Sequence, residues 1–176
     1  MSFPPPPSSN AVVAVVGAGT MGHGIAQVAA QAGYAVHLAD ALPGAAARGL
    51  ERIRANLEGA VQRGKASAAE RDAALARIAV AADALTAARG AALVIEAVPE
   101  DLDLKCSLFR ALGGAAPEAV LATNTSSLSV AAIAAASGRP ERVVGMHFFN
   151  PVHLMRLVEV VTHEGTSPAA REAARR

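Results

Sequence analysis

A glycine-rich stretch near the start of the sequence has residue types that could hold a phosphate group. Residues 15–22 read Val-Val-Gly-Ala-Gly-Thr-Met-Gly, which contains the spacing G-x-G-x-x-G. In this pattern the first glycine permits a tight turn, the second lets the backbone approach a pyrophosphate, and the third allows close helix–strand packing. The free N–H groups at the start of the helix that follows attract an anion. The stretch predicts a dinucleotide-binding loop. The expected cofactor contacts in it are Gly17, Gly19, Thr20, Met21 and Gly22.

An acidic residue follows this loop at the position that a ribose contact requires. Asp40 comes directly after the predicted strand 35–39, 18 residues after Gly22. Its carboxylate would accept hydrogen bonds from a ribose diol and would repel a 2′-phosphate. The first lysine or arginine of the chain is Arg48, so no such cation precedes it to bind a 2′-phosphate. Asp40 therefore favours NAD over NADP, and glycines used only for turns would leave it unexplained.

A histidine and a glutamate in the last third of the chain could form an acid–base pair. Oxidation of a secondary alcohol needs a base for the hydroxyl proton, and the pKa of histidine suits that task. His147 closes an apolar segment, and Glu159 lies within Leu-Val-Glu-Val-Val, where we expect it to be buried and to need a partner. Both residues are six positions from His153, so strands that fold back there would place them opposite each other. From the residues alone, a purely structural histidine–glutamate pair remains the alternative.

Strand and helix patterns alternate along the chain and would position these residues. Short apolar runs predict strands, and apolar residues at helical spacing predict the helices between them. Gly33 stands where the first helix should be capped, and Ser67 and Glu70 have the spacing of a capping box. We expect strands at 11–16, 35–39, 91–98, 119–123, 143–147 and 155–162, and helices after the glycine loop, around 50–61, from 67, and at 102–112 and 130–136. The pattern predicts an α/β fold of the doubly wound Rossmann type, mostly parallel, with a helical-hairpin insertion and antiparallel last strands.

Length and composition limit the possible classes of function. The chain has 176 residues, a formal net charge of +1 and a single cysteine. It is long enough for one domain with a sizeable core, and the balanced charge does not suggest binding to nucleic acid or to a membrane surface. One cysteine allows no disulfide framework, which favours a reducing compartment, so we expect a cytoplasmic protein. We expect residues 1–10 to be a disordered proline-rich leader, 11–165 to be one NAD-binding domain, and no metal site.

Several longer motifs resemble one enzyme family. They are "GAGTMGHGIAQ", "IEAVPED", "NTSSL", "GMHFFNP" and "LVEVV". Together they are similar to the 3-hydroxyacyl-CoA dehydrogenases of β-oxidation, in particular to the bacterial 3-hydroxybutyryl-CoA and 3-hydroxyadipyl-CoA types. The resemblance covers the chain from Ala11 to Thr162. It implies NAD-dependent oxidation of a 3-hydroxyacyl-CoA to a 3-oxoacyl-CoA, with an acyl-CoA as substrate.

The resemblance also implies roles for individual residues. It assigns His147 and Glu159 as the catalytic pair and Ser126 as a contact to the substrate oxygen and the nicotinamide, where helix capping is the alternative. It gives Glu100, Lys105 and Asn150 as further cofactor contacts. For Lys105 the alternative is an ion pair with Asp101 along a helix, and for Asn150 a turn before Pro151. Arg63 and Lys65, near the tip of the helical hairpin, would meet the phosphates of coenzyme A, or would form a solvated basic turn.

The motifs end at about Thr162, whereas members of the family continue into a second, mostly helical domain. That domain supplies a catalytic asparagine, much of the acyl pocket and the main homodimer interface. Residues 166–176 have the pattern of a helix beginning at Ser167, which we expect to lead toward such a domain. Two hypotheses follow: the chain is the cofactor domain of an NAD-dependent 3-hydroxyacyl-CoA dehydrogenase, or it is a free-standing NAD-binding module. Another β-hydroxyacid dehydrogenase is a third alternative.

Overall fold

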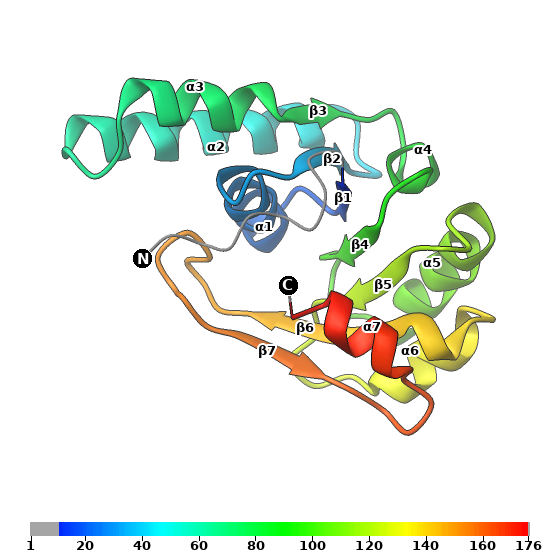
Figure 1. The fold of residues 1–176 in the computed structure, drawn as a ribbon. Helices are drawn as coiled ribbons and strands as arrows, with labels where there is room; N and C mark the ends of the chain where they lie inside the picture. The colour runs from blue at the N-terminus through cyan, green and yellow to red at the C-terminus, as the bar shows by residue number, and fades with distance from the viewer. Residues whose placement is uncertain (1–10, 176) are drawn as a thin grey trace.

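The protein folds around one seven-stranded sheet, described in a computed structural model that covers residues 11–175 (Figure 1). The proline-rich leader predicted for residues 1–10 lies outside the described residues. The strands are β1 Val12–Val16, β2 Ala35–Ala39, β3 Ile78–Val80, β4 Leu93–Glu96, β5 Val120–Thr123, β6 Val143–Phe148 and β7 Val158–Val161. The helices are α1 Thr20–Gln31, α2 Ala45–Gln62, α3 Ala68–Ala76, α4 Ala84–Ala88, α5 Leu102–Ala115, α6 Val130–Ala136 and α7 Pro168–Ala173, with a 3₁₀ turn at Pro140–Arg142.

The sheet has the strand order β3-β2-β1-β4-β5-β6-β7. Every neighbouring pair is parallel except β6 and β7, which are antiparallel. The order reverses between β1 and β4, because the chain first builds outward through β2 and β3 and then returns to the other side of β1. In open α/β sheets, ligands bind beside the carboxyl ends of the strands at such a switch point. The doubly wound, mostly parallel fold predicted from the sequence is therefore confirmed.

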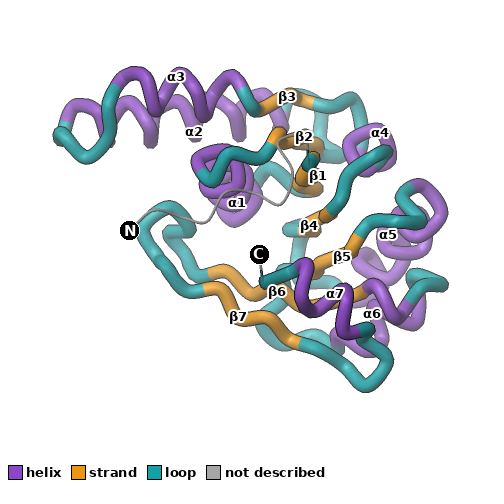
Figure 2. Tube along the Cα trace, viewed as in Figure 1, coloured by secondary structure: helices purple, strands orange, loops and turns teal. Residues whose placement is uncertain are grey.

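Helices cover both faces of the sheet (Figure 2). Their buried side chains form two separate apolar cores with it. One core joins the sheet to α1, α2, α3 and α7, and the other joins it to α4, α5 and α6. Successive residues of β1 alternate between them, since Val15 faces the first core and Ala14 the second, both with no exposed surface. This burial on both faces explains why the strand reads as an unbroken apolar run.

The local signals at the helix ends behave as the sequence indicated. Gly33 has a φ of +102° just after α1, which is the left-handed conformation of a C-terminal cap. Ser67 and Glu70 form the capping box of α3, with each side chain accepting from the other residue's backbone N–H. Helices α2 and α3 lie side by side as the predicted hairpin (Figure 1). Ser167 caps α7, whose Ala170 is buried in the first core.

Several element boundaries differ from the prediction. The short β3 and α4 were not predicted, because β3 buries only Ile78 and α4 has five residues held by the Asp83 cap. Strand β4 is shorter than the predicted 91–98, since the chain leaves the sheet at its loop after Glu96. Strand β7 begins at Val158, three residues later than predicted, because residues 155–157 belong to the long turn from β6.

Candidate active site

A cleft of about 390 Å³ opens at the carboxyl ends of the strands, beside the switch point between β1 and β4. Strands β1, β4, β5 and β6 all end at this edge because they run parallel. The cleft therefore collects residues from four separate loops. The polar residues among those that line it are Glu100, Asn124, Ser126, His147 and Asn150, and Met21 lines it from the glycine loop. Every one of these except Asn124 was a predicted site residue.

Glycine is present at the three positions of the loop for different structural reasons. Gly17 has a φ of +97°, and a Cβ there would lie 2.6 Å from the carbonyl oxygen of Ala97. A Cβ on Gly22 would lie 1.6 Å from the carbonyl oxygen of Gly17, so the first turn of α1 can pack on the loop only without a side chain. A Cβ on Gly19 would meet nothing within 4 Å. Gly17 and Gly22 are thus required by the fold, while Gly19 faces open space at the start of α1.

That open space fits the pyrophosphate of a dinucleotide. Gly19 is the residue that precedes α1, it is exposed, and no side chain caps the helix there. The first N–H groups of a helix have no partner within it and point outward along its axis. A ligand oxygen can approach them because Gly19 has no side chain in the way. The tight turn at Gly17 and the close packing at Gly22 are observed, while the contact of the loop with a pyrophosphate at Gly19 stays a prediction.

Asp40 also has a structural role that the sequence did not indicate. Its Oδ2 accepts from the backbone N–H of Ala18 at 2.7 Å, and its Oδ1 accepts from that of Leu42 at 2.9 Å. The carboxylate thereby ties the end of β2 to the glycine loop. Each carboxylate oxygen accepts more than one hydrogen bond, so these contacts leave capacity for a ribose diol. The ribose contact of Asp40 stays a prediction.

His147 and Glu159 stand directly opposite each other on β6 and β7, as the symmetry about His153 predicted. The Nδ1 of His147 lies 2.8 Å from Oε2 of Glu159, and the ring of Phe149 lies 4.5 Å from the imidazole ring between centroids. With Nδ1 bound to the carboxylate, Nε2 of a neutral imidazole is the nitrogen that can take a proton. The pair has the geometry of a base and its orienting carboxylate.

The expectation that Glu159 is buried was wrong. Its side chain is 54% exposed, and the side chain of His147 is 24% exposed. Strand β7 is the edge of the sheet and has only β6 as a neighbour, and no residue of β7 is fully buried. An apolar run on an edge strand does not bury its members unless another layer covers it. The hydrogen bond to His147 therefore orients the ring and does not compensate a buried charge.

Ser126 is held in the cleft by Glu100 and does not cap a helix. Glu100 Oε1 accepts from the Oγ1 of Thr125 at 2.6 Å and from the backbone N–H of Ser126 at 3.0 Å. The N-terminus of α6 is capped by Ser129 instead. Burial alone would raise the pKa of Glu100, but these hydrogen bonds and the charge of Lys105 outweigh it and hold the pKa below its ordinary value. Glu100 is therefore an anion that fixes the backbone of Ser126.

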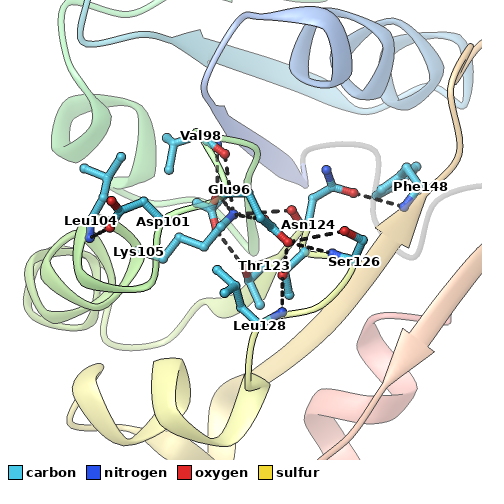
Figure 3. Close-up of polar contacts among 12 residues, drawn as sticks. Glu96, Val98, Asp101, Leu104, Lys105, Thr123, Asn124, Ser126, Leu128 and Phe148 are labelled. Atoms are coloured by element: carbon cyan, nitrogen blue, oxygen red, sulfur yellow. Dashed lines mark hydrogen bonds and ion pairs between the residues drawn. The ribbon is translucent and has the colours of Figure 1, made fainter.

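Lys105 does not have the position that either interpretation of the sequence gave it. Its side chain is fully buried, so it does not reach the cleft, and Asp101 caps α5 by accepting from Leu104. Its Nζ donates to Oε1 of Glu96 at 2.6 Å (Figure 3). It also lies 3.5 Å from Oε2 of Glu100. Lys105 is in the first turn of α5, and its side chain runs inward to Glu96 at the end of β4, so its ammonium is buried.

Glu96 and Asn124 are site residues that the sequence analysis missed. Glu96 is a fully buried acid at the end of β4, and it lies in the apolar run Leu-Val-Ile-Glu. A charge within an apolar strand was the signal that could have found it, as it found Glu159. Asn124 follows β5, and its Oδ1 accepts from the backbone N–H of Phe148, which joins the loops after β5 and β6 (Figure 3).

The remaining predicted residues divide between the cleft and the hairpin. Asn150 lines the cleft beside His147. Arg63 and Lys65 are exposed at the turn between α2 and α3 and do not line the cleft. Burial lowers the pKa of His153, and the nearby charges of His23 and Arg63 lower it further, so the turn after β6 lies within electrostatic reach of the hairpin tip.

A family model for the NAD binding domain of 3-hydroxyacyl-CoA dehydrogenase matches residues 12–176. The chain belongs to this family. The match identifies residues 12–176 as an NAD-binding domain, and the assignment of individual residues to the cofactor stays a prediction. Among the described residues 11–175, no group of three or more histidine, cysteine, aspartate or glutamate side chains could hold a metal ion. Within the same range, no helix is long and apolar enough to cross a bilayer.

Curated relatives and solved structures agree with this assignment. The chain is 44% identical over 156 residues to a probable 3-hydroxybutyryl-CoA dehydrogenase of Bacillus subtilis, a match that covers 88% of this chain and 54% of that protein. It is 47% identical over 156 residues to the 3-hydroxyadipyl-CoA dehydrogenase of Escherichia coli, covering 88% of this chain and 33% of the other. The crystal structure of an Escherichia coli 3-hydroxybutyryl-CoA dehydrogenase superposes with a TM-score of 0.89 at 44% identity, over 94% of this chain and 35% of that one.

The chain spans about half the length of several of these relatives and a third of others. The crystal structure of (S)-3-hydroxybutyryl-CoA dehydrogenase from Ralstonia eutropha superposes with a TM-score of 0.88 at 37% identity. The match covers 92% of this chain and only 57% of the Ralstonia chain. The likeness therefore establishes the NAD-binding domain, while the activity of a complete enzyme requires separate argument.

Proposed function

We propose that this chain provides the cofactor site and the acid–base pair of an enzyme that oxidises (S)-3-hydroxyacyl-CoA to 3-oxoacyl-CoA with NAD⁺. The observation that supports it most strongly is the 2.8 Å contact between Glu159 and His147, because His147 lines the same cleft as Met21 of the glycine loop. The relatives named above are dehydrogenases of 3-hydroxybutyryl-CoA and 3-hydroxyadipyl-CoA, which favours a short-chain or dicarboxylic acyl group.

The residues of the cleft fit the proton transfer of this reaction. When bound, NAD⁺ accepts the hydride that leaves the carbinol carbon. His147 takes the hydroxyl proton on Nε2 while its Nδ1–H remains bonded to Glu159. The carboxylate fixes the tautomer and stabilises the imidazolium that forms. The electron pair of the broken O–H bond becomes the second bond of the new carbonyl group. The positive charge of the imidazolium stays beside the carboxylate of Glu159.

Ser126 and Asn150 have positions that suit binding and orientation. Both line the cleft, and the backbone of Ser126 is fixed by its hydrogen bond to Glu100. We assign Ser126 to the substrate oxygen and the nicotinamide, and Asn150 to the nicotinamide side. Such fixed contacts raise the rate by holding the reacting atoms in line. Arg63 and Lys65 are exposed cations at the hairpin tip, and we assign them to the phosphates of coenzyme A.

Three further parts of the proposal concern the complete protein. We propose that it works in β-oxidation in the cytoplasm and that a helical domain outside this chain completes the acyl pocket and forms a homodimer. We propose residues 11–165 as the NAD-binding domain and 166–176 as the approach to that further domain. Exposed apolar side chains at the turn before β7, namely Leu154, Met155 and Leu157, support a covering partner on this edge of the sheet.

The test compares this chain with a chimera in which the C-terminal part of the Bacillus subtilis relative follows Thr162. We expect NAD⁺ binding by both proteins, measured by calorimetry, and oxidation of 3-hydroxybutyryl-CoA, followed by NADH absorbance, mainly by the chimera. Missing pocket contacts lower the rate beyond any loss of binding. The chimera with His147→Ala is the matched control. A folded chimera that binds NAD⁺ but does not oxidise the substrate would refute the proposed reaction.

A further inference from the structure

Glu96 is, with Lys105, one of two fully buried charged groups behind the cleft, and nothing in the proposed reaction uses it. Its side chain has no exposed surface, and its two carboxylate oxygens accept three hydrogen bonds. Oε1 accepts from Lys105 Nζ at 2.6 Å and from the backbone N–H of Val98 at 2.7 Å. Oε2 accepts from Oγ1 of Thr123 at 2.7 Å. Glu96 therefore joins the end of β4 to α5 and to β5 (Figure 3).

Lys105 lies between two carboxylates that differ in their distance from its ammonium and in their burial. Its Nζ is 2.6 Å from Glu96 and 3.5 Å from Glu100, and it also lies within 3.5 Å of the backbone oxygens of Val98 and Asn124. A buried ammonium is stable only with a counter-ion. The closer carboxylate is Glu96, which is fully buried, whereas the side chain of Glu100 is 38% exposed and lines the cleft. Glu96 thus neutralises most of the charge of Lys105.

The consequence concerns the charge at the cleft. Glu96 and Lys105 cancel each other's charge, so the three groups together keep one net negative charge, carried by Glu100 at the cleft. Its Oε1 accepts from Thr125 and Ser126. The nicotinamide ring is a cation when oxidised and neutral when reduced. A fixed anion beside its binding site stabilises the first form over the second. Without the charge of Glu96, Lys105 would turn to Glu100 and remove that preference.

We propose that Glu96 is a positioning residue that holds Lys105 as its counter-ion and thereby keeps a net negative charge at Glu100, which favours oxidised over reduced cofactor. This inference rests on the NAD site described above and does not depend on the acyl-CoA reaction. Burial raises the pKa of the Glu96 carboxyl, and the charge of Lys105 opposes that effect. The 2.6 Å contact between Lys105 Nζ and Glu96 Oε1 is the observation that pairs the two groups.

The test removes the charge of Glu96 and keeps its shape. In Glu96→Gln the amide oxygen can still accept from Lys105 and Val98, and the hydroxyl of Thr123 can turn to accept from the amide NH₂. We measure the Kd of the 176-residue chain for NAD⁺ and for NADH by calorimetry. We expect the ratio of the NADH Kd to the NAD⁺ Kd to fall about tenfold, the size of effect for one charge at a protein surface.

Two further variants separate charge from structural damage. Glu96→Gln with Lys105→Met removes both buried charges and should return the ratio to the wild-type value or above it, although it changes more of the structure. Glu51→Gln removes an exposed charge on α2, where the side chain is 69% exposed, and should leave the ratio unchanged. If Glu96→Gln fails to fold, Glu100→Gln should lower the ratio while the double variant keeps it at the wild-type value or above. A lowered ratio in the double variant would then overturn the inference.

The outcomes distinguish this inference from the proposed function. Equal changes in both Kd values for Glu96→Gln, or a double variant with the same lowered ratio, would overturn it. A wild-type chain that binds neither form would contradict the proposed cofactor site instead. In that case a crystal structure of Glu96→Gln still decides, since we expect Lys105 Nζ to lie closer to Glu100 than the present 3.5 Å. An unchanged distance there would also overturn the inference.

Discussion

Alanine substitution at two glycines of the same loop should separate cofactor binding from folding. At Gly22 the added Cβ would lie 1.6 Å from the carbonyl oxygen of Gly17, which is backbone and cannot move aside cheaply. Overpacking of this kind costs about 3 kcal/mol, at the upper end of the usual range. For a chain of this size each kcal/mol lowers Tm by roughly 2–4 °C, so Gly22→Ala should lower the Tm of the cofactor-free chain by about 6–12 °C.

At Gly19 the same substitution should leave the fold intact and weaken the binding of the cofactor. Its Cβ would meet nothing within 4 Å, and its φ of −69° suits alanine. Replacing glycine at the N-cap lowers the free energy of unfolding by a few tenths of a kcal/mol to about 1 kcal/mol. The lower entropy of the unfolded chain raises it by about 0.4–1 kcal/mol. Tm should therefore change by less than about 2 °C. The methyl group would occupy the approach of the pyrophosphate, so affinity for NAD⁺ should fall about 5- to 150-fold, as overpacking of 1–3 kcal/mol predicts.

The assay is thermal unfolding without cofactor, followed by circular dichroism, together with calorimetric titration of NAD⁺. The two variants are each other's control, because they add the same methyl group three residues apart. A Gly22→Ala chain with unchanged Tm would refute the packing argument. A Gly19→Ala chain with wild-type affinity for NAD⁺ would show that the pyrophosphate does not approach the loop at this residue.

Three other predictions concern the carboxylates and the base. Asp40→Asn should reduce the ratio of the NADP Kd to the NAD Kd, while its amide oxygen can still accept from the backbone N–H of Ala18. Calorimetric titration with both cofactors tests this, and an unchanged ratio would contradict the ribose contact of Asp40. In the chimera, His147→Ala should lower turnover roughly 10²–10⁴-fold with little change in NAD⁺ binding, and Glu159→Gln should also slow it; near-normal turnover of His147→Ala would exclude it as the base. The pKa of Glu100 is lowered from 4.5, so its ionised form stabilises the fold above that pH and the gain is lost as pH falls below it. The Tm difference between wild type and Glu100→Gln should therefore shrink as pH falls below 4.5, and a constant difference from pH 7 to pH 3 would contradict this.

The sequence by itself determined the features that depend on near neighbours in the chain. The spacing of Gly17, Gly19 and Gly22 predicted the loop, because a tight turn and a close backbone approach are local requirements. The positions of Ser67 and Glu70 predicted the start of α3 for the same reason. The equal distances of His147 and Glu159 from His153 predicted their pairing, since an antiparallel turn fixes the register of its two strands.

Only the tertiary structure decided which charged side chains are buried and what they contact. Glu159 was expected inside and is exposed, because its strand lies at the edge of the sheet. Lys105 was expected at the surface or at the cofactor and is buried, because its ammonium pairs with Glu96 inside the molecule. Glu96 and its partners come from β4, β5 and α5, which no spacing along the chain relates. Burial depends on which layer covers a residue, and the layers are set by strand order rather than by local sequence.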